Sequence, residues 1–341
     1  MAWTIALNFE DGVSRFITCG ENEKVLDAAY RQKINLPMDC SDGVCGTCKC
    51  RCESGGYALG DDYLEDALSE QENAQGMVLT CQMIPTSDCV ISVPASSGMC
   101  KTASEHFQAD ITHMVALSDS AIELRLNLDS QTGIGFLPGQ YVNIRLPDSD
   151  ATRAYSFSSL PGDNAVSFLI RNVPDGLMSN YLARRAKPGD RLSLSGPFGS
   201  FYLRAVQRPV LMLAGGTGLA PFLSMLHSLQ QTPPDYPIHL VYAVTHDSDA
   251  VKLPQLDEFA RTIPNFNYRL CVADPASGSA RKGYVTEHLD DVMLNAGDVD
   301  VYLCGPPPMV DAVMGFFTAR SLTPHGFYYE KFTPQAIAEA C

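Results

Sequence analysis

Four cysteines have a spacing that suits metal binding. In the run Cys40-Ser-Asp-Gly-Val-Cys45-Gly-Thr-Cys48 the thiols are separated by four and then two residues, and 32 residues lie between Cys48 and Cys81. This C-x4-C-x2-C…C pattern is typical of plant-type [2Fe-2S] clusters, which need four thiolates. Zinc sites prefer paired C-x2-C hooks, so the first gap favours iron and sulfur over zinc. The sequence predicts metal ligation by Cys40, Cys45, Cys48 and Cys81.

An arginine, a tyrosine and a serine that share one predicted strand could bind a flavin. Alternation along the strand places Arg153 and Tyr155 on the same face. The arginine can pair with a pyrophosphate and the tyrosine can stack along an isoalloxazine ring, while the hydroxyl of Ser156 can reach its N5 edge. This combination of residue types favours FAD as a cofactor.

Two segments are typical of phosphate-binding helix starts. Residues 176–179 open a predicted helix at 180–185, and a buried strand at 210–214 runs into a glycine-rich turn and another helix. Backbone amides at the beginning of a helix attract phosphate groups. The first segment suits the flavin pyrophosphate, or else is an ordinary capped helix, and the second suits the diphosphate of a dinucleotide. The candidate residues are Gly176, Met178, Ser179, Gly215, Gly216, Thr217 and Gly218.

The choice between NADH and NADPH depends on the end of the next predicted strand, at 238–244. An acidic side chain there accepts a hydrogen bond from a free ribose 2′-hydroxyl, whereas an arginine favours a 2′-phosphate. No arginine or lysine lies between Val241 and Val251. NADH is therefore expected, with Asp247 as the first candidate and Asp249 as the second, unless both are ordinary surface-loop residues.

Two pairs of residues near the carboxyl terminus could line a site of hydride transfer. Cys304 and Gly305 follow a predicted buried strand, and a thiol beside a glycine leaves room for a nicotinamide ring. Alternatively, Cys304 is a buried residue before a rigid proline turn. Glu330 and Phe332 lie two positions apart. The aromatic ring could cover a flavin or could be a hydrophobic residue at a frayed terminus.

The elements that must position these residues change in type twice along the chain, which predicts three domains. Residues 1–96 combine short strands with two helices, the second near 61–70, and a polar linker follows at 97–105. Six alternating runs within 106–205 predict an antiparallel β-barrel, and strands that alternate with helices in 206–341 predict a doubly wound parallel sheet. The expected fold class is multidomain, α+β and α/β.

Composition and charge exclude several classes of protein. Asp and Glu outnumber Lys and Arg by 39 to 24, a formal net charge of −15, which argues against nucleic acid and anionic membranes as partners. Residues 1–100 carry 15 acidic and 6 basic side chains, a balance that could attract a basic redox protein or simply maintain solubility. With no apolar run long enough to span a bilayer and no signal-peptide pattern, a cytoplasmic location is expected.

In this order, the motifs resemble the reductase components of bacterial ring-hydroxylating oxygenases, within the ferredoxin-NADP reductase superfamily. The resemblance covers essentially the whole chain. The ferredoxin-first arrangement is most similar to the benzoate, toluate and anthranilate 1,2-dioxygenase reductases, and to those of benzoate in particular. Residues 333–341 continue past the acid–aromatic pair that closes some members, which bears on the stacking position of Phe332.

The resemblance implies a β-grasp plant-type ferredoxin domain, an FAD-binding β-barrel, an NADH-binding α/β domain and a relay of electrons through them. Hydride would pass from NADH to noncovalent FAD, with Ser156, Cys304 and Glu330 lining the transfer site. Single electrons would then leave through the [2Fe-2S] cluster to a terminal Rieske-type oxygenase. A reductase for a di-iron phenol, toluene or methane monooxygenase would look much the same. A ferredoxin fused to an unreactive barrel is a more distant alternative.

Overall fold

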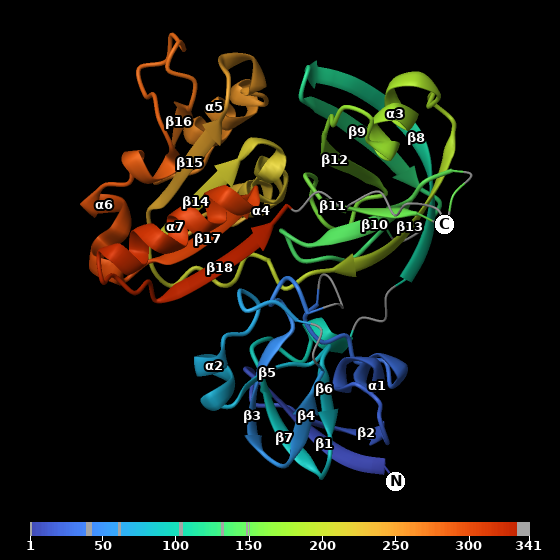
Figure 1. Ribbon diagram of the computed structural model, residues 1–341. Helices are drawn as coiled ribbons and strands as arrows, with labels where there is room; N and C mark the ends of the chain where they lie inside the picture. The colour runs from blue at the N-terminus through green and yellow to red at the C-terminus, as the bar shows by residue number, and fades with distance from the viewer. Residues whose placement is uncertain are drawn as a thin grey trace. The chain divides into compact units, whose positions relative to one another are not determined.

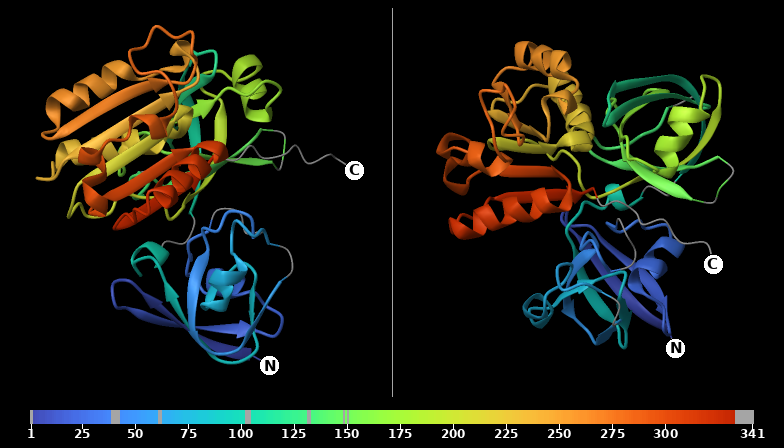
Figure 2. Two further views of the ribbon diagram at one scale, coloured as in Figure 1. Left: turned by 60° about the vertical axis from the view of Figure 1, so that its left-hand side comes forward. Right: turned by 45° about the horizontal axis from the view of Figure 1, so that its top comes forward.

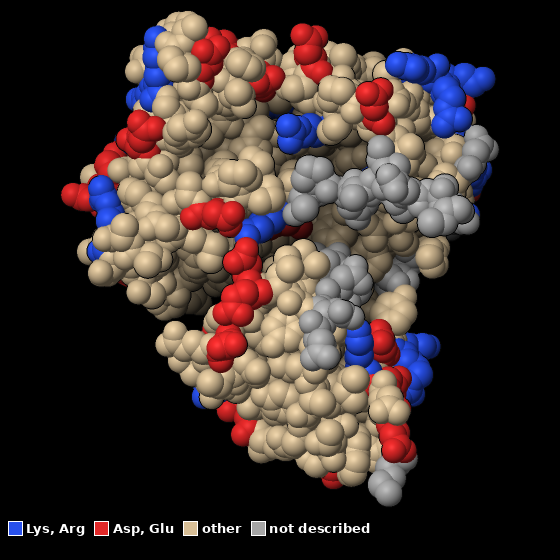
Figure 3. All heavy atoms as spheres, in the orientation of Figure 1, with Lys and Arg blue, Asp and Glu red and all other residues tan. Residues whose placement is uncertain are grey.

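The chain forms two compact units in a computed structural model that describes residues 2–38, 43–60, 63–101, 105–130, 133–147, 149 and 151–332. The first unit comprises Met1–His106 with Ser195–Ser200, and the second comprises Phe107–Leu194 with Phe201–Cys341 (Figure 1). Within the described ranges, no helix combines the length and the apolar character needed to cross a membrane. On the face seen in Figure 3, basic side chains form small groups between acidic ones.

The first unit is a β-grasp fold, in which a mixed sheet holds one helix against its face. Its sheet has the strand order β2-β1-β7-β3-β5, with β1 and β7 parallel and the other pairs antiparallel. Helix α1 buries Val25, Leu26 and Ala29 against this sheet. The elements are β1 (Ala2–Phe9), β2 (Ser14–Gly20), α1 (Val25–Arg31), β3 (Lys49–Ser54), β4 (Tyr57–Leu59), α2 (Glu70–Ala74), β5 (Met77–Leu79), β6 (Met83–Pro85) and β7 (Cys89–Val93).

The position of the second helix differs from the sequence-based expectation. It was expected near 61–70, of which residues 61 and 62 lie outside the described ranges, but it begins at Glu70, because Ser69 and Glu72 form a reciprocal capping box that fixes its start there. The segment expected to be a linker is packed at its beginning. Ser97 donates to Oδ2 of Asp11 at 2.8 Å, and Cys100 is 2% exposed.

The barrel of the second unit is a six-stranded antiparallel sheet that closes on itself. Its order is β11-β10-β13-β8-β9-β12, and a bridge between Phe157 and Phe168 joins the two outer strands. All six expected strands are present, and helix α3 covers one end of the barrel (Figure 1). The elements are β8 (Glu105–Ser118), β9 (Ala121–Leu128), β10 (Tyr141–Arg145), β11 (Thr152–Ser156), β12 (Ala165–Arg171), α3 (Leu177–Arg184) and β13 (Arg191–Phe198).

The remaining part of the second unit is a doubly wound parallel sheet of order β16-β15-β14-β17-β18. Helices α4 and α5 pack on one face, and α6 and α7 pack on the other (Figure 2). Alternate residues of the central strand serve the two faces, Met212 facing α4 and Leu213 facing α7. The elements are β14 (Val210–Gly215), α4 (Leu219–Gln231), β15 (Ile238–Val244), α5 (Leu253–Thr262), β16 (Phe266–Val272), α6 (Asp291–Leu294), β17 (Asp300–Gly305), α7 (Pro307–Ala319) and β18 (Gly326–Lys331).

Strand β18 was not predicted from the sequence. It runs parallel to β17, with Cys304 beside Glu330 in the register. Glu330 therefore lies within a paired strand and not at a frayed terminus.

Candidate functional site

The cysteine loop brings two of its predicted ligands into contact at the end of the first unit's sheet. Cys48 precedes β3 and Cys81 follows β5, and these strands pair antiparallel. Their sulfur atoms lie 3.2 Å apart and both residues are buried. Cys45 is half-buried, and its sulfur accepts a hydrogen bond from the amide of Thr47 at 3.5 Å. Cys40 lies outside the described residues.

The backbone of this loop has the conformation that is needed to fold around a cluster. Gly43 and Gly46 have φ values of 78° and 73°, which side-chain-bearing residues rarely adopt. A β-carbon on Gly46 would lie 3.2 Å from the carbonyl oxygen of Ala67. No three metal-ligating side chains converge within the described ranges, yet the thiols of Cys45, Cys48 and Cys81 are the donor chemistry that iron and sulfide need.

Strand β11 places Arg153 and Tyr155 on one face and Ser156 on the other, and Tyr155 pairs with Val142 of the barrel core. The Arg153 guanidinium donates to the carbonyl of Thr152 at 2.8 Å and forms no ion pair with a carboxylate of the described chain. Its charge is therefore available to an anionic ligand. Tyr155 packs beside the apolar cluster that also buries Met178, and burial raises the pKa of its hydroxyl.

The start of helix α3 can serve a ligand through its backbone. Gly176 is the N-cap residue and supplies no side-chain capping bond, so amides of the first turn remain for an anion. The side chains of the two other predicted residues are engaged within the protein. Met178 is 3% exposed in the barrel core, and the hydroxyl of Ser179 accepts from the amide of Val173 at 2.9 Å.

Ser156, Glu330 and Cys304 meet at the carboxyl edge of the parallel sheet, although 174 residues separate the first two. The Ser156 hydroxyl donates to Oε2 of Glu330 at 3.1 Å, and the Cys304 sulfur lies 3.8 Å from the same oxygen. All three are buried. The serine comes from β11 of the barrel, whereas the other two are neighbours on β17 and β18.

This cluster is suited to orienting a bound ring through hydrogen bonds, and its thiol is not suited to nucleophilic attack. Burial, together with the nearby Glu330 carboxylate, raises the pKa of Cys304 well above the ordinary range. The sulfur is therefore a neutral thiol at physiological pH, and a neutral thiol is a weak nucleophile. A hydroxyl, a carboxylate and a thiol held at these distances can orient the edges of planar rings through hydrogen bonds.

The glycine turn at the end of β14 leaves no room for a side chain at Gly215 or Gly218. A β-carbon on Gly218 would lie 2.3 Å from the carbonyl oxygen of Cys304, and one on Gly215 would lie 2.5 Å from the sulfur of Met309. Gly216 has a φ of 54° and no atoms within 4 Å of its β-carbon position. Thr217 completes the turn and is 9% exposed. The turn therefore packs against the end of β17 and opens helix α4, as expected for a diphosphate-binding edge.

The two candidate ribose acids have different surroundings. Asp247 is exposed after β15, and its Oδ1 accepts from the hydroxyl of Ser277 at 2.7 Å. Asp249 is engaged on both carboxylate oxygens, since Oδ1 accepts from Ser120 at 2.6 Å and Oδ2 accepts from the amide of His246 at 3.0 Å. Of the two carboxylates, that of Asp247 is the more exposed. The sequence offered no signal for Ser277, which reaches Asp247 from a different loop.

Phe332 directly follows β18. Its amide donates to the carbonyl of Gly305 at 2.9 Å, and its ring packs beside the apolar cluster under β14 and β15. The backbone of Phe332 thus continues the pairing of β18 with the Cys304–Gly305 turn.

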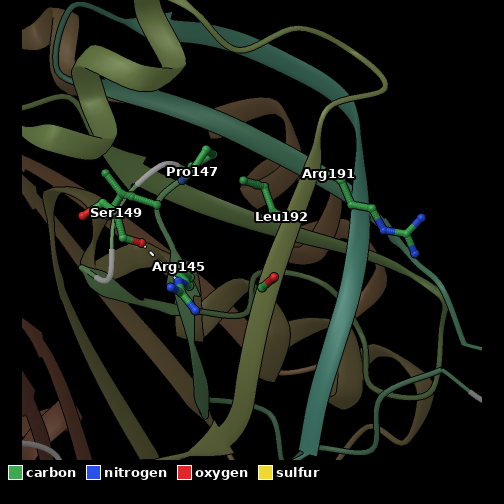
Figure 4. A pocket seen from close by; sticks show the side chains of 7 residues that line it. Arg145, Pro147, Ser149, Arg191 and Leu192 are labelled. Atoms are coloured by element: carbon green, nitrogen blue, oxygen red, sulfur yellow. Dashed lines mark hydrogen bonds between the residues drawn. The ribbon is translucent and has the colours of Figure 1, made fainter.

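A shallow pocket of about 430 Å³ opens beside Arg145, at the carboxyl-terminal end of β10, between this strand and β13 (Figure 4). Tyr141 pairs with Ser156, but Arg145, at the pocket, pairs with Thr152. None of the predicted site residues lines it, and its arginine at 145 donates to the Ser149 carbonyl. The pocket is therefore separate from the Ser156–Glu330 contact.

Comparisons with known proteins match three family models in sequence order. Residues 8–86 match the 2Fe-2S iron-sulfur cluster binding domain. Residues 108–202 match the oxidoreductase FAD-binding domain, and residues 212–314 match the oxidoreductase NAD-binding domain. The three models account for the cofactor types that the sequence predicts.

Two similar proteins that match over nearly their whole length are dioxygenase components. The chain is 56% identical over 336 residues to the toluate 1,2-dioxygenase electron transfer component of Pseudomonas putida, covering 98% of this chain and 100% of that protein. It is 48% identical to the 2-halobenzoate 1,2-dioxygenase electron transfer component of Burkholderia cepacia, with 98% and 99% covered.

Among solved structures, the Amycolatopsis cytochrome P450 reductase matches with a TM-score of 0.75 at 29% identity, covering 97% of this chain and 99% of that one. The ferredoxin reductase in carbazole 1,9a-dioxygenase matches with a TM-score of 0.67 at 26% identity, covering 97% and 100%. Together with the three family models, this agreement over the whole length identifies the chain. It belongs to the family of iron–sulfur flavoprotein oxidoreductases that serve as electron transfer components of aromatic-ring dioxygenases, with [2Fe-2S], FAD and NADH as cofactors.

Proposed function

We propose that this chain takes hydride from NADH and delivers single electrons to the terminal Rieske-type oxygenase of a benzoate-type 1,2-dioxygenase. The observation that carries the proposal is the 56% identity to the toluate component over the whole chain. Benzoate and toluate differ by one ring methyl group, so the two systems need the same kind of reductase.

We also propose three domains, at 1–96, 106–205 and 206–341, with a linker at 97–105.

In this proposal the residues of the second unit bind and align the two organic cofactors. Arg153 and the amides at the start of α3 hold the pyrophosphate of FAD, and Tyr155 flanks its ring system. Gly215, Gly216, Thr217 and Gly218 hold the diphosphate of NADH against the end of β17. When bound, the flavin supplies the conversion of a two-electron hydride into two one-electron steps.

The Ser156, Cys304 and Glu330 cluster is proposed to align the rings for hydride transfer. The serine hydroxyl, donating to Glu330, faces the flavin edge, and the uncharged Cys304 thiol with Gly305 admits the nicotinamide. Phe332 is proposed to cover the flavin. Asp247, held by Ser277, is proposed to select NADH by accepting from the ribose 2′-hydroxyl and repelling a 2′-phosphate.

In the first unit, Cys40, Cys45, Cys48 and Cys81 are proposed to hold the [2Fe-2S] cluster as four thiolates. The ten cysteines within the described ranges are all free of disulfides. Cysteines in this number without a disulfide suit a reducing compartment, which supports a cytoplasmic location.

The partner distinguishes this proposal from its nearest alternative. A reductase component of propane 2-monooxygenase is 31% identical to this chain over 98% of its length, below the 40% to 56% of the toluate, 2-halobenzoate and anthranilate 1,2-dioxygenase components. A preference for a dioxygenase partner is therefore expected.

Reconstitution tests this preference. The cofactor-loaded chain is mixed with the oxygenase component of toluate 1,2-dioxygenase or with the hydroxylase of propane 2-monooxygenase, and NADH-dependent product is measured. Turnover with the dioxygenase component supports the proposal. Turnover with the hydroxylase alone would contradict it.

A further inference from the structure

Lys252 and Glu123 form a nearly buried ion pair between the parallel sheet and the barrel, both within the second unit. Nζ of Lys252 lies 2.8 Å from Oε1 of Glu123, and the two side chains are 15% and 9% exposed. Arg125, on the same strand β9, lies 3.1 Å from the same oxygen. Burial tends to raise the pKa of Glu123, but the charges of Lys252 and Arg125 hold it below its usual range. The carboxylate is therefore ionised at neutral pH.

Lys252 adopts a backbone conformation that lysine rarely takes. Its φ of 63° lies in the left-handed region, where glycine or asparagine is the usual residue. Its carbonyl accepts from the amides of Gln255 and Leu256 at 3.0 Å, so the residue begins helix α5. Glycine could make this turn at lower cost. A strained lysine with its ammonium group buried against another domain indicates that the side chain is needed there.

Three further polar contacts join the same two parts along the carboxyl edge of the sheet. Ser120 Oγ donates to Asp249 Oδ1 (2.6 Å), Ser224 Oγ donates to the Ser159 carbonyl (2.7 Å), and Ser156 Oγ donates to Glu330 Oε2 (3.1 Å). These come from the segment after β15, from helix α4 and from β18. The ion pair lies on the β15 side, and the Glu330 contact lies on the opposite side of the strand order.

The apolar contacts between the two parts cannot fix their orientation alone. Ala121 and Leu169 of the barrel pack into the apolar cluster around β14 and α4. Burial of apolar surface is non-directional and tolerates sliding, whereas an ion pair and hydrogen bonds have preferred distances and angles. The barrel register links the two ends of the interface, since Glu123 pairs with Leu169, and the neighbouring Phe168 bridges to Phe157, next to Ser156.

We propose that Lys252 and Glu123 are positioning residues, which fix the orientation of the dinucleotide-binding sheet so that the nicotinamide meets the flavin at Ser156. This inference rests on the proposed function. Loss of the pair leaves the single hydrogen bond from Ser120 to Asp249, of the contacts named above, to hold the β15 side. NADH should then still bind its own domain, but with its ring misaligned. A misplacement of about 1 Å can slow a reaction by roughly 100-fold.

Stopped-flow reduction of the flavin by NADH in the full chain tests this proposal. In Lys252→Gly, which removes the side chain and suits the left-handed backbone, the limiting rate at saturating NADH should fall by about 10-fold or more. The dissociation constant for NADH should stay nearly unchanged. Lys252→Arg should retain most of the rate. Amide hydrogen exchange without NADH supplies a second readout, and it should increase at 118–125 and 247–256 in Lys252→Gly.

Arg261→Met is the matched control, because Arg261 pairs with Glu258 on the surface of the same helix. It should leave the limiting rate unchanged. Glu123→Gln should slow reduction, and the double variant Lys252→Gly/Glu123→Gln should be no slower than the slower single variant. Wild-type limiting rates in both Lys252→Gly and Glu123→Gln would overturn the inference, as would losses that multiply in the double variant. Failure of the wild-type flavin to be reduced by NADH would instead refute the proposed function.

Discussion

A methyl group added to Gly218 should separate the glycine turn from the end of β17. The new β-carbon would lie 2.3 Å from the carbonyl oxygen of Cys304, 2.8 Å from its carbonyl carbon and 3.1 Å from the α-carbon of Gly305. Real β-carbons keep at least 3.0 Å from such atoms, so the backbones must move apart by about 0.7 Å. Since all three contacts are backbone atoms, no side chain can rotate to relieve them.

The expected loss of stability follows from this geometry. Overpacking of a close contact costs about 1 to 3 kcal/mol, and a contact between two backbones belongs in the upper part of that range. For a unit of this size, about 2 to 3 kcal/mol corresponds to a decrease of roughly 4 to 12 °C in the melting temperature. Gly216→Ala is the matched control, because its β-carbon meets nothing within 4 Å and only its φ of 54° is unfavourable. It should cost about 1 to 2 kcal/mol.

Calorimetry and stopped-flow reduction by NADH measure the two consequences. Gly218→Ala should melt below Gly216→Ala and should reduce its flavin more slowly, because the displaced Cys304 backbone moves the Cys304–Glu330 pair. If Gly218→Ala is as stable as Gly216→Ala and reduces its flavin at the wild-type rate, the packing of the turn against β17 does not position this site.

Three further predictions concern single side chains. Arg153→Ala should lose FAD during gel filtration while Arg125→Ala retains it, and stoichiometric flavin in Arg153→Ala would remove the pyrophosphate assignment. The wild-type chain should show a higher kcat/KM for NADH than for NADPH, and Asp247→Asn should narrow the difference; equal values in the wild type would refute the role of Asp247. Because the pKa of Cys304 is raised, its thiol should resist iodoacetamide at mildly alkaline pH and become reactive only as the pH rises further or the protein unfolds. Rapid labelling of Cys304 in the folded chain, identified by mass spectrometry, would show that the thiolate forms there.

Many strands of this protein could be predicted from the sequence because they have a local pattern. Apolar and polar residues alternate along the barrel strands. The β14, β15 and β17 segments are instead nearly continuous apolar runs, which burial on both faces of a parallel sheet requires. Strand β18 lacks such a run, since polar ends flank Phe327, Tyr328 and Tyr329 at the edge of the sheet. The sequence alone therefore left Glu330 in an apparently frayed segment.

Contacts between segments that are distant in the sequence could not be predicted from local patterns. The bond from Ser156 to Glu330 depends on how the barrel docks on the sheet, and only family resemblance brought these residues together beforehand. Asp249 was a plausible ribose ligand until its bond with Ser120 placed it at the interface. The start of α2 is different, because it has a local signal in the sequence. The Ser69–Glu72 capping box predicts a helix that begins at Glu70.

The order of electron transfer can be tested with Cys45→Ser, which removes one proposed cluster ligand and leaves the second unit intact. NADH-dependent reduction of ferricyanide and electron delivery to the toluate 1,2-dioxygenase oxygenase component are measured on the same FAD-loaded preparation. The variant should lose its cluster absorption and its delivery to the oxygenase while it reduces ferricyanide at nearly the wild-type rate. Delivery to the oxygenase at the wild-type rate without cluster absorption would show that electrons do not leave through these cysteines.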